Sequence, residues 1–141
     1  VIDAAADRMD VYLARQHLAQ GAANTLDDLQ TLVRRFRDER DWKQFHTPKD
    51  LAAAIAIEAA ELQELFLWQD IDTQAATVAN RNEAVRHEIA DVVILALAFA
   101  EATGIDLEAA ILEKLRVNEE KYPADQVRGS AAKYTDLGPE N

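Results

Sequence analysis

Apolar residues recur every three or four positions along most of this chain, which is the spacing of helices with one buried side. Four Gly and three Pro among 141 residues are few, and they fall where helices should start or stop. Thr25 with Asp28 is typical of a capping box, and Thr47–Pro48 of a helix start. We therefore predict an all-α, four-helix-bundle-like protomer with helices over residues 25–40, 47–69, 81–103 and 106–122.

The other segments have weaker patterns. Residues 3–20 form a weak helical segment, and residues 70–80 a polar connection with room for one helical turn. Gly104 suits a left-handed helix cap, Asp106 an N-cap, and Pro123 ends the last helix. We expect three parts: an N-terminal extension (1–24), partly helical, a catalytic domain (25–123) and an extended C-terminal tail (124–141).

Two of the predicted helices are apolar on more than one face. Residues 51–66 and 88–100 leave little polar surface for solvent, whereas a helix of a monomeric bundle needs one apolar stripe. Burial against a second subunit explains the excess, so we expect a homo-oligomer, a dimer or a dimer of dimers. A central helix within a monomer is the alternative.

Charge and composition narrow the class of partner. The formal net charge is −11 with no cysteine, which excludes disulfides and thiolate chemistry and disfavours nucleic-acid polymers and anionic membranes as partners. The longest apolar run, Val92 to Ala100, is far shorter than the ~20 residues of a membrane span. No secretory signal precedes the first helix, so we expect a soluble, cytoplasmic protein.

Carboxylates interrupt the two apolar helices. Glu58 and Glu61 lie one turn apart on the first, and Glu88 and Asp91 on the second. No Lys or Arg occurs between Lys49 and Arg81 to neutralise the first pair. Raised pKa values, basic partners or a bound divalent cation would each compensate for the repulsion.

Four carboxylates on facing helices suit Mg²⁺ or Mn²⁺, which prefer oxygen ligands. Solvated acids on an exposed helix edge are the simpler alternative. A di-iron site is disfavoured, because its Glu-x-x-His motif is absent: none of His17, His46 and His87 follows a Glu by three residues.

The pattern Glu58-Ala-Ala-Glu61 followed by Glu88-Ile-Ala-Asp91 resembles the ExxE…ExxD signature of the MazG-type nucleotide pyrophosphohydrolases. Within that superfamily the chain is most similar to the small dCTP pyrophosphatases. Four further strings carry this likeness in matching order: ERDWKQFHTP (39–48), ELQELFLW (61–68), NEEKYP (118–123) and RGSAAKYTDL (128–137).

The resemblance implies a Mg²⁺-dependent hydrolase, in which Mn²⁺ can substitute, that converts a deoxynucleoside triphosphate such as dCTP or a modified analogue to its monophosphate and pyrophosphate. Its role would be house-cleaning of the nucleotide pool. Glu58, Glu61, Glu88 and Asp91 would ligate the metal, and one carboxylate would orient or deprotonate the attacking water. Glu64 is a spare candidate for the base.

By the same resemblance, two groups of residues would bind the substrate. Trp42, His46 and Trp68 would line the base pocket, with Phe45 nearby. Asn118, Lys121, Lys133 and Tyr134 would contact phosphates or sugar, Arg128 being a weaker candidate, and the tail could close over the substrate as a lid.

Other functions stay open at the level of sequence. Within the enzyme class, a relative acting on dUTP or phosphoribosyl-ATP would carry similar acids. Outside it, a non-catalytic helical interaction module could use the same acids for a structural metal. The aromatic and tail motifs beside the acids favour the enzyme, because a bundle alone does not need them.

Overall fold

The computed structural model of this chain describes residues 25–136, which divide into two compact units at the Thr103–Gly104 boundary. Each unit is described by itself below. The division precedes the last long helix, so a single catalytic domain over residues 25–123 stays a prediction. The weak helical segment over residues 3–20, and the N-terminal extension that contains it, lie outside the described residues.

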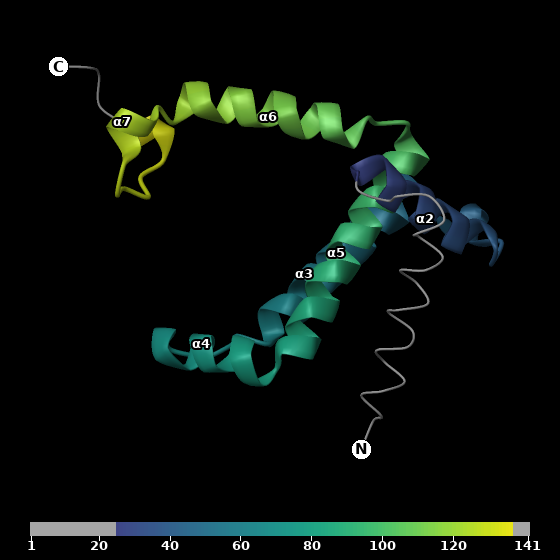
Figure 1. The fold of residues 1–141 in the computed structure, drawn as a ribbon, viewed down its shortest axis with the longest axis horizontal. Coiled ribbons are helices and arrows are strands. Elements are labelled where there is room, and N and C mark those ends of the chain that lie inside the picture. Colours follow the sequence, from purple (N-terminus) through teal and green to yellow (C-terminus); the bar gives the residue numbers. More distant parts are fainter. Residues whose placement is uncertain (1–24, 137–141) are drawn as a thin grey trace. The chain divides into compact units, whose positions relative to one another are not determined.

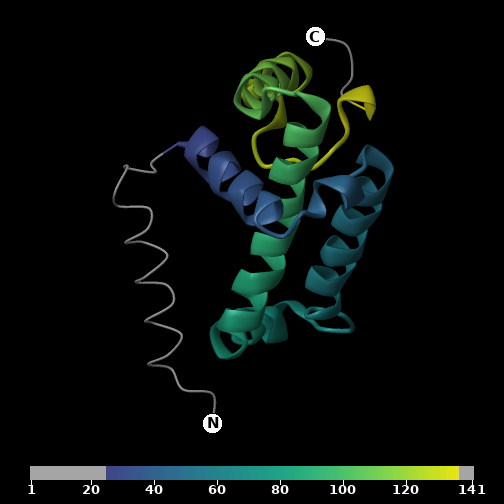
Figure 2. The same cartoon turned by 90° about the vertical axis from the view of Figure 1, so that its right-hand side faces the viewer.

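The first unit is built of helices. They are α2 (Leu26–Asp38), the 3₁₀-helix η1 (Trp42–Phe45), α3 (Pro48–Glu64), α4 (Ile71–Asn80) and α5 (Asn82–Thr103). Helix α5 is the centre of this unit, because α3 packs along it and α2 crosses it nearer its C-terminal end (Figures 1 and 2). The small buried core consists of Leu51, Leu65, Leu97, Ala98 and Ala100.

Helix α2 begins as its sequence predicts. The Thr25 hydroxyl accepts the Asp28 N–H at 3.2 Å, and the Asp28 carboxylate accepts the Thr25 N–H at 3.1 Å, which completes the capping box. Arg34 reaches across to Glu101 of α5, with 3.7 Å between nitrogen and oxygen. This ion pair joins α2 to the helix that carries two of the four acids.

Helix α3 starts at Pro48 under a Thr47 cap, as predicted, but it ends at Glu64 rather than near Trp68 or Gln69. The backbone tightens after Glu64, where Phe66 donates to Gln63 and Leu67 to Glu64, each three residues back. Trp68 then takes a left-handed conformation, with φ at 62°. An apolar pattern alone does not reveal this exit, because Leu65 and Phe66 continue the stripe.

The predicted polar connection over residues 70–80 is a full helix. Asp70 caps it by accepting the Thr73 N–H at 2.8 Å, and α4 then runs for ten residues before α5 begins at Asn82. Its second turn buries Thr77, whose hydroxyl bonds to Gln69, shortly after the end of α3. The prediction of a connection with one helical turn was therefore wrong, because the segment forms a ten-residue helix.

The second unit comprises α6 (Leu107–Lys121), α7 (Ala124–Val127) and the 3₁₀-helix η2 (Tyr134–Asp136). Gly104 has the predicted left-handed φ, at 70°, and Asp106 caps α6 by accepting the Ala109 N–H. The tail is not simply extended: it forms α7 and η2, and the Tyr134 ring meets Tyr122 edge-on with centroids 5.9 Å apart.

The described residues are almost all helix and connecting turns, with no strand among them, so the all-α prediction is confirmed. None of their helices combines the length and apolarity needed to cross a bilayer. Large apolar side chains nevertheless remain exposed on α3, α5 and α6, among them Ile57, Ile89, Val93, Ile111, Leu112 and Leu115.

Candidate active site

Three of the four predicted acids converge where α3 packs along α5. Carboxylate oxygens of Glu58, Glu88 and Asp91 all lie within 4.8 Å of one another. Glu58 comes from α3 and the other two from one face of α5, three residues apart. Glu58 and Glu88 are half-buried, whereas Asp91 is exposed. We call these three residues the acid cluster.

The acid cluster is electrostatically strained. Partial burial raises the pKa of Glu58, and the charges of Glu61, Asp91 and Glu88 raise it further. Across residues 25–136 none of these four acids forms an ion pair with Lys, Arg or His. Among the described residues no basic side chain relieves the repulsion, which is the setting in which a bound cation would stabilise the acids.

Glu61 lies next to this cluster without being one of its three members. It is exposed on α3 one turn after Glu58, close enough to act on the Glu58 carboxylate. The exposed Glu64 follows one turn later, at the last position of the helix. Their roles as a fourth ligand and a spare base stay predictions.

The donor set fits a hard divalent cation. Three carboxylates supply only oxygen atoms, which is the chemistry of Mg²⁺ and Mn²⁺ sites that also accept water and phosphate oxygens. A soft metal would require thiolates, and the chain has no cysteine. The acid cluster could thus bind a metal ion through three oxygens and leave the other coordination positions of the metal open for water or a ligand.

Aromatic side chains gather around η1, between α2 and α3. The Trp42 ring meets Phe36 edge-on with centroids 5.9 Å apart, and 44% of Trp42 remains exposed. Phe45, on the same short helix, is more exposed still. Partly exposed aromatic rings such as these can stack on a flat ligand.

His46, directly after η1, has an unusual environment. Its Nδ1 atom is buried and has no hydrogen-bond partner among residues 25–136. Burial lowers the pKa of His46, and the nearby Arg37 charge lowers it further. The lowered pKa of His46 favours the neutral imidazole, a form that suits hydrogen bonding to a neutral base edge.

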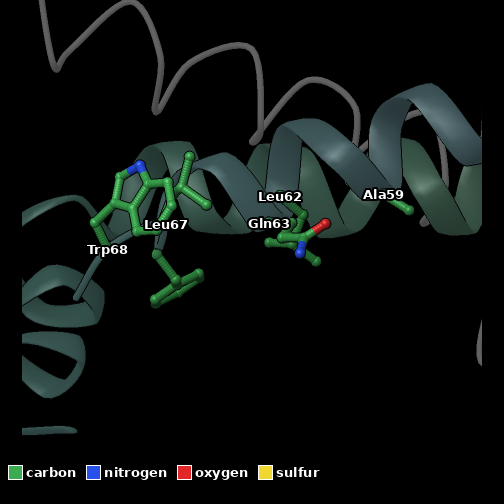
Figure 3. A pocket seen from close by; sticks show the side chains of 6 residues that line it. Ala59, Leu62, Gln63, Leu67 and Trp68 are labelled. Atoms are coloured by element: carbon green, nitrogen blue, oxygen red, sulfur yellow. The ribbon is translucent and has the colours of Figure 1, made fainter. Parts of the chain in front are cut away.

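Trp68 lies at the end of an apolar groove of about 460 Å³ beside the last turns of α3. Figure 3 shows the indole standing at one end of this groove, beyond Leu67, with Leu62, Gln63 and Ala59 following along the helix. Phe66 completes the lining. At 95% exposure, the Trp68 side chain contributes almost nothing to the core.

The remaining four predicted binding residues belong to the second unit. Lys121 is at the end of α6, with its ammonium 5.0 Å from the centre of the Tyr134 ring, and Asn118 is one turn earlier. Lys133 directly precedes Tyr134 and is exposed. The unit thus brings Lys121 and Tyr134 together, while the part of all four in substrate binding stays a prediction.

Sequence reasoning missed several residues that shape these sites. Arg37 is buried beside His46, and its guanidinium is bound by Asp38 at 2.6 Å. Gln69 and Thr77 hold the backbone next to Trp68 through a 2.7 Å hydrogen bond. Arg37 could have been suspected because it lies four residues after Val33 and continues the apolar stripe of α2. No local signal links Gln69 to a residue eight positions away.

Comparison with known proteins relates this chain to one family by two routes, a family model and individual relatives. A family model described as MazG-like matches residues 53–137, which contain all four acids. Mouse dCTP pyrophosphatase 1 is 41% identical over 116 residues, covering 80% of this chain and 68% of the relative, and the human protein is 39% identical over 115 residues with the same coverage.

A solved structure supports the same relationship. The crystal structure of a pyrophosphatase from Archaeoglobus fulgidus superimposes with a TM-score of 0.67 at 40% sequence identity, covering 70% of this chain and 92% of the other. Sequence and fold therefore agree on the class of protein that this chain resembles.

Proposed function

Because this chain belongs to the MazG-like family and is a nucleotide pyrophosphatase, we propose that it hydrolyses a deoxynucleoside triphosphate to the monophosphate and pyrophosphate. The name of the mammalian relatives makes dCTP, or a modified form of it, the first substrate to test. Removal of unwanted nucleotides from the cytoplasmic pool would be the role of such an enzyme.

The observation that carries the proposal is the acid cluster. Three carboxylates within 4.8 Å, with no cation from the described residues to neutralise them, repel one another, and a bound cation would relieve that repulsion. The net charge of the chain is −11, so a triphosphate needs positive charge at its contact with the protein.

We assign Glu58, Glu88 and Asp91 as ligands of Mg²⁺, with Glu61 as the fourth, and Mn²⁺ as an acceptable substitute. When bound, the metal would neutralise phosphate charge and make a coordinated water more acidic. The raised pKa of Glu58 supports this assignment, because a carboxylate surrounded by like charges gains most from a cation.

The chain's own part in the reaction is positioning and proton transfer. The water oxygen forms a bond to the α- or β-phosphorus, the α–β phosphoanhydride bond breaks, and pyrophosphate and the monophosphate result from either attack. A carboxylate of the cluster, or Glu64 one turn beyond Glu61, accepts the proton that the water loses.

Substrate recognition is divided between two sets of residues. Trp42 and Trp68 offer exposed indoles for stacking on the base, and neutral His46 offers a hydrogen bond to it. Asn118, Lys121, Lys133 and Tyr134 would bind phosphates or sugar, with the tail from residue 124 closing as a lid.

We also propose that the enzyme is a homo-oligomer, a dimer or a dimer of dimers. The exposed apolar side chains on α3, α5 and α6 support this, because contact with a second subunit would bury them. We expect neither a nucleic-acid polymer nor a membrane as a partner, because the net charge of the chain is −11.

The test is release of pyrophosphate from a panel of ribo- and deoxynucleoside triphosphates, each with Mg²⁺ and with EDTA. We expect metal-dependent release, strongest with dCTP or a modified pyrimidine nucleotide. No release from any nucleotide, by a protein whose circular dichroism is helical, would contradict the proposal and favour a structural metal site.

A further inference from the structure

Trp68 has a backbone conformation that its residue type disfavours. Its φ of 62° lies in the left-handed region, where a bulky side chain is strained. Asp41 is the other non-glycine residue with positive φ among the described residues, and Asp tolerates that region far better. The Trp68 indole is 95% exposed, so no packing of the described residues offsets the strain.

Hydrogen bonds hold the next residue, Gln69, from two sides. Its side-chain amide donates to the Leu65 carbonyl at 2.8 Å, at the end of α3. Its amide oxygen accepts the hydroxyl of Thr77, on α4, at 2.7 Å. Thr77 is only 7% exposed and Leu65 is equally buried, so both anchors of Gln69 belong to the packed part of the unit.

The backbone of Gln69 is fixed as well. Its N–H donates to Phe66 and its carbonyl accepts from the Gln74 side chain. Trp68 thus lies between the tightened end of α3 and Gln69, whose backbone and side chain are both held by hydrogen bonds. Strain of this kind persists only where the surrounding structure enforces it, and it collects at binding sites.

We propose that Gln69 and Thr77 are positioning residues, which hold Trp68 in its strained conformation so that its indole stands at the end of the groove to stack on the nucleobase. The groove supplies a matching apolar wall, from Leu62 to Leu67 (Figure 3). A flat aromatic ring is the chemical class of ligand that this arrangement takes. The inference rests on the proposed function, in which Trp68 contacts the base.

A merely structural role makes a different prediction. If the Gln69–Thr77 bond served only to shape the turn between α3 and α4, its loss would lower stability and leave base binding unchanged. If it positions Trp68, its loss weakens substrate binding more than turnover, because the indole contacts the bound substrate rather than the reacting phosphorus.

The matched variants are Thr77→Val, which removes the hydroxyl and keeps the shape, and Thr77→Ser, which keeps the hydroxyl. We expect Thr77→Val to raise KM for the best nucleotide roughly fivefold with kcat nearly unchanged, and Thr77→Ser to resemble the wild type. Gln69→Met, which removes both side-chain bonds, should act like Thr77→Val and replaces it if that variant does not fold.

A spectroscopic readout tests the positioning directly. In a Trp42→Phe background, Trp68 is the single tryptophan of the chain. We expect Thr77→Val to lower its fluorescence anisotropy, because the backbone that carries the indole gains freedom, and Thr77→Ser to leave it unchanged. Wild-type KM and wild-type anisotropy in both Thr77→Val and Gln69→Met would overturn the inference.

Trp68→Ala separates this inference from the proposed function. If Trp68→Ala raises KM but the Gln69 and Thr77 variants do not, the positioning role is wrong and the base contact stands. If Trp68→Ala leaves KM and base preference unchanged, the base contact is wrong, and the positioning role falls with it.

Discussion

A single carboxyl group, that of Glu58, connects the electrostatics of the site to its chemistry. Burial and three neighbouring acids raise its pKa, so the folded protein holds a proton there more readily than the unfolded chain does. In the metal-free protein the charged form of Glu58 is disfavoured. This lowers the free energy of unfolding at pH values above the raised pKa of the folded protein, and has no effect below the pKa of the unfolded chain.

The sign of the pH dependence follows. As pH rises through the interval between the unfolded and the raised folded pKa of Glu58, the metal-free protein should lose stability. Glu58→Gln should remove this loss, which thermal unfolding in EDTA across the acidic range measures. Glu113→Gln, an exposed acid on α6, is the control and should keep it. An unchanged pH profile in Glu58→Gln would contradict the assignment.

Trp42 tests the base pocket at the same scale. Its ring contacts Phe36 by an edge and leaves 44% of the residue exposed. We expect Trp42→Ala to raise KM about tenfold or more, since stacking on a base is worth roughly 1–3 kcal/mol, and Trp42→Phe to have a smaller effect. Substrate kinetics on a nucleotide panel measure both; identical profiles for the two variants and the wild type would remove Trp42 from the pocket.

At the scale of elements, local signals decided which predictions succeeded. The starts of α2, α3 and α6 follow from Thr25, Thr47 and Asp106, because a cap is a contact between residues three apart. The exit of α3 could not be predicted, since Gln69, the residue after the left-handed Trp68, is bonded to Thr77 of the next helix. Tertiary contacts override propensity there.

The Thr47 cap provides a prediction about α3, the helix that carries Glu58. Its hydroxyl accepts the Asp50 N–H at 3.2 Å. Thr47→Ala should cost about 1 kcal/mol of unfolding free energy, whereas Thr47→Ser should retain most of it. Urea unfolding followed by circular dichroism measures the difference. Equal stability of the two variants would mean that the cap contributes nothing.

At the scale of the whole molecule, the acid cluster was predictable and its surroundings were not. Two i, i+3 pairs on apolar helices indicated that the acids share one face of each helix, and the packing of α3 along α5 brings three of them together. The environment of His46 and the fixing of Gln69 depend on residues distant in sequence, Arg37 and Thr77, which no spacing rule relates to them.

The exposed apolar surface yields a prediction about assembly. Leu112 on α6 is 61% exposed, and burial in a subunit contact would explain it. Leu112→Lys should shift the protein toward a smaller species in light scattering coupled to size-exclusion chromatography. Glu113→Lys, next to it, introduces the same side chain at a polar position and should not. A wild-type protein that is monomeric at every concentration would contradict the oligomer.

The central claim is that the acid cluster of α3 and α5 is the centre of a metal-dependent pyrophosphohydrolase. Pyrophosphate release from dCTP with Mg²⁺, compared among wild type, Asp91→Asn and the control Asp72→Asn on α4, tests it most directly. We predict that Asp91→Asn loses activity by orders of magnitude while its fold is kept, because relieved repulsion does not destabilise it, and that Asp72→Asn remains active. Full activity in a folded Asp91→Asn protein would contradict the account.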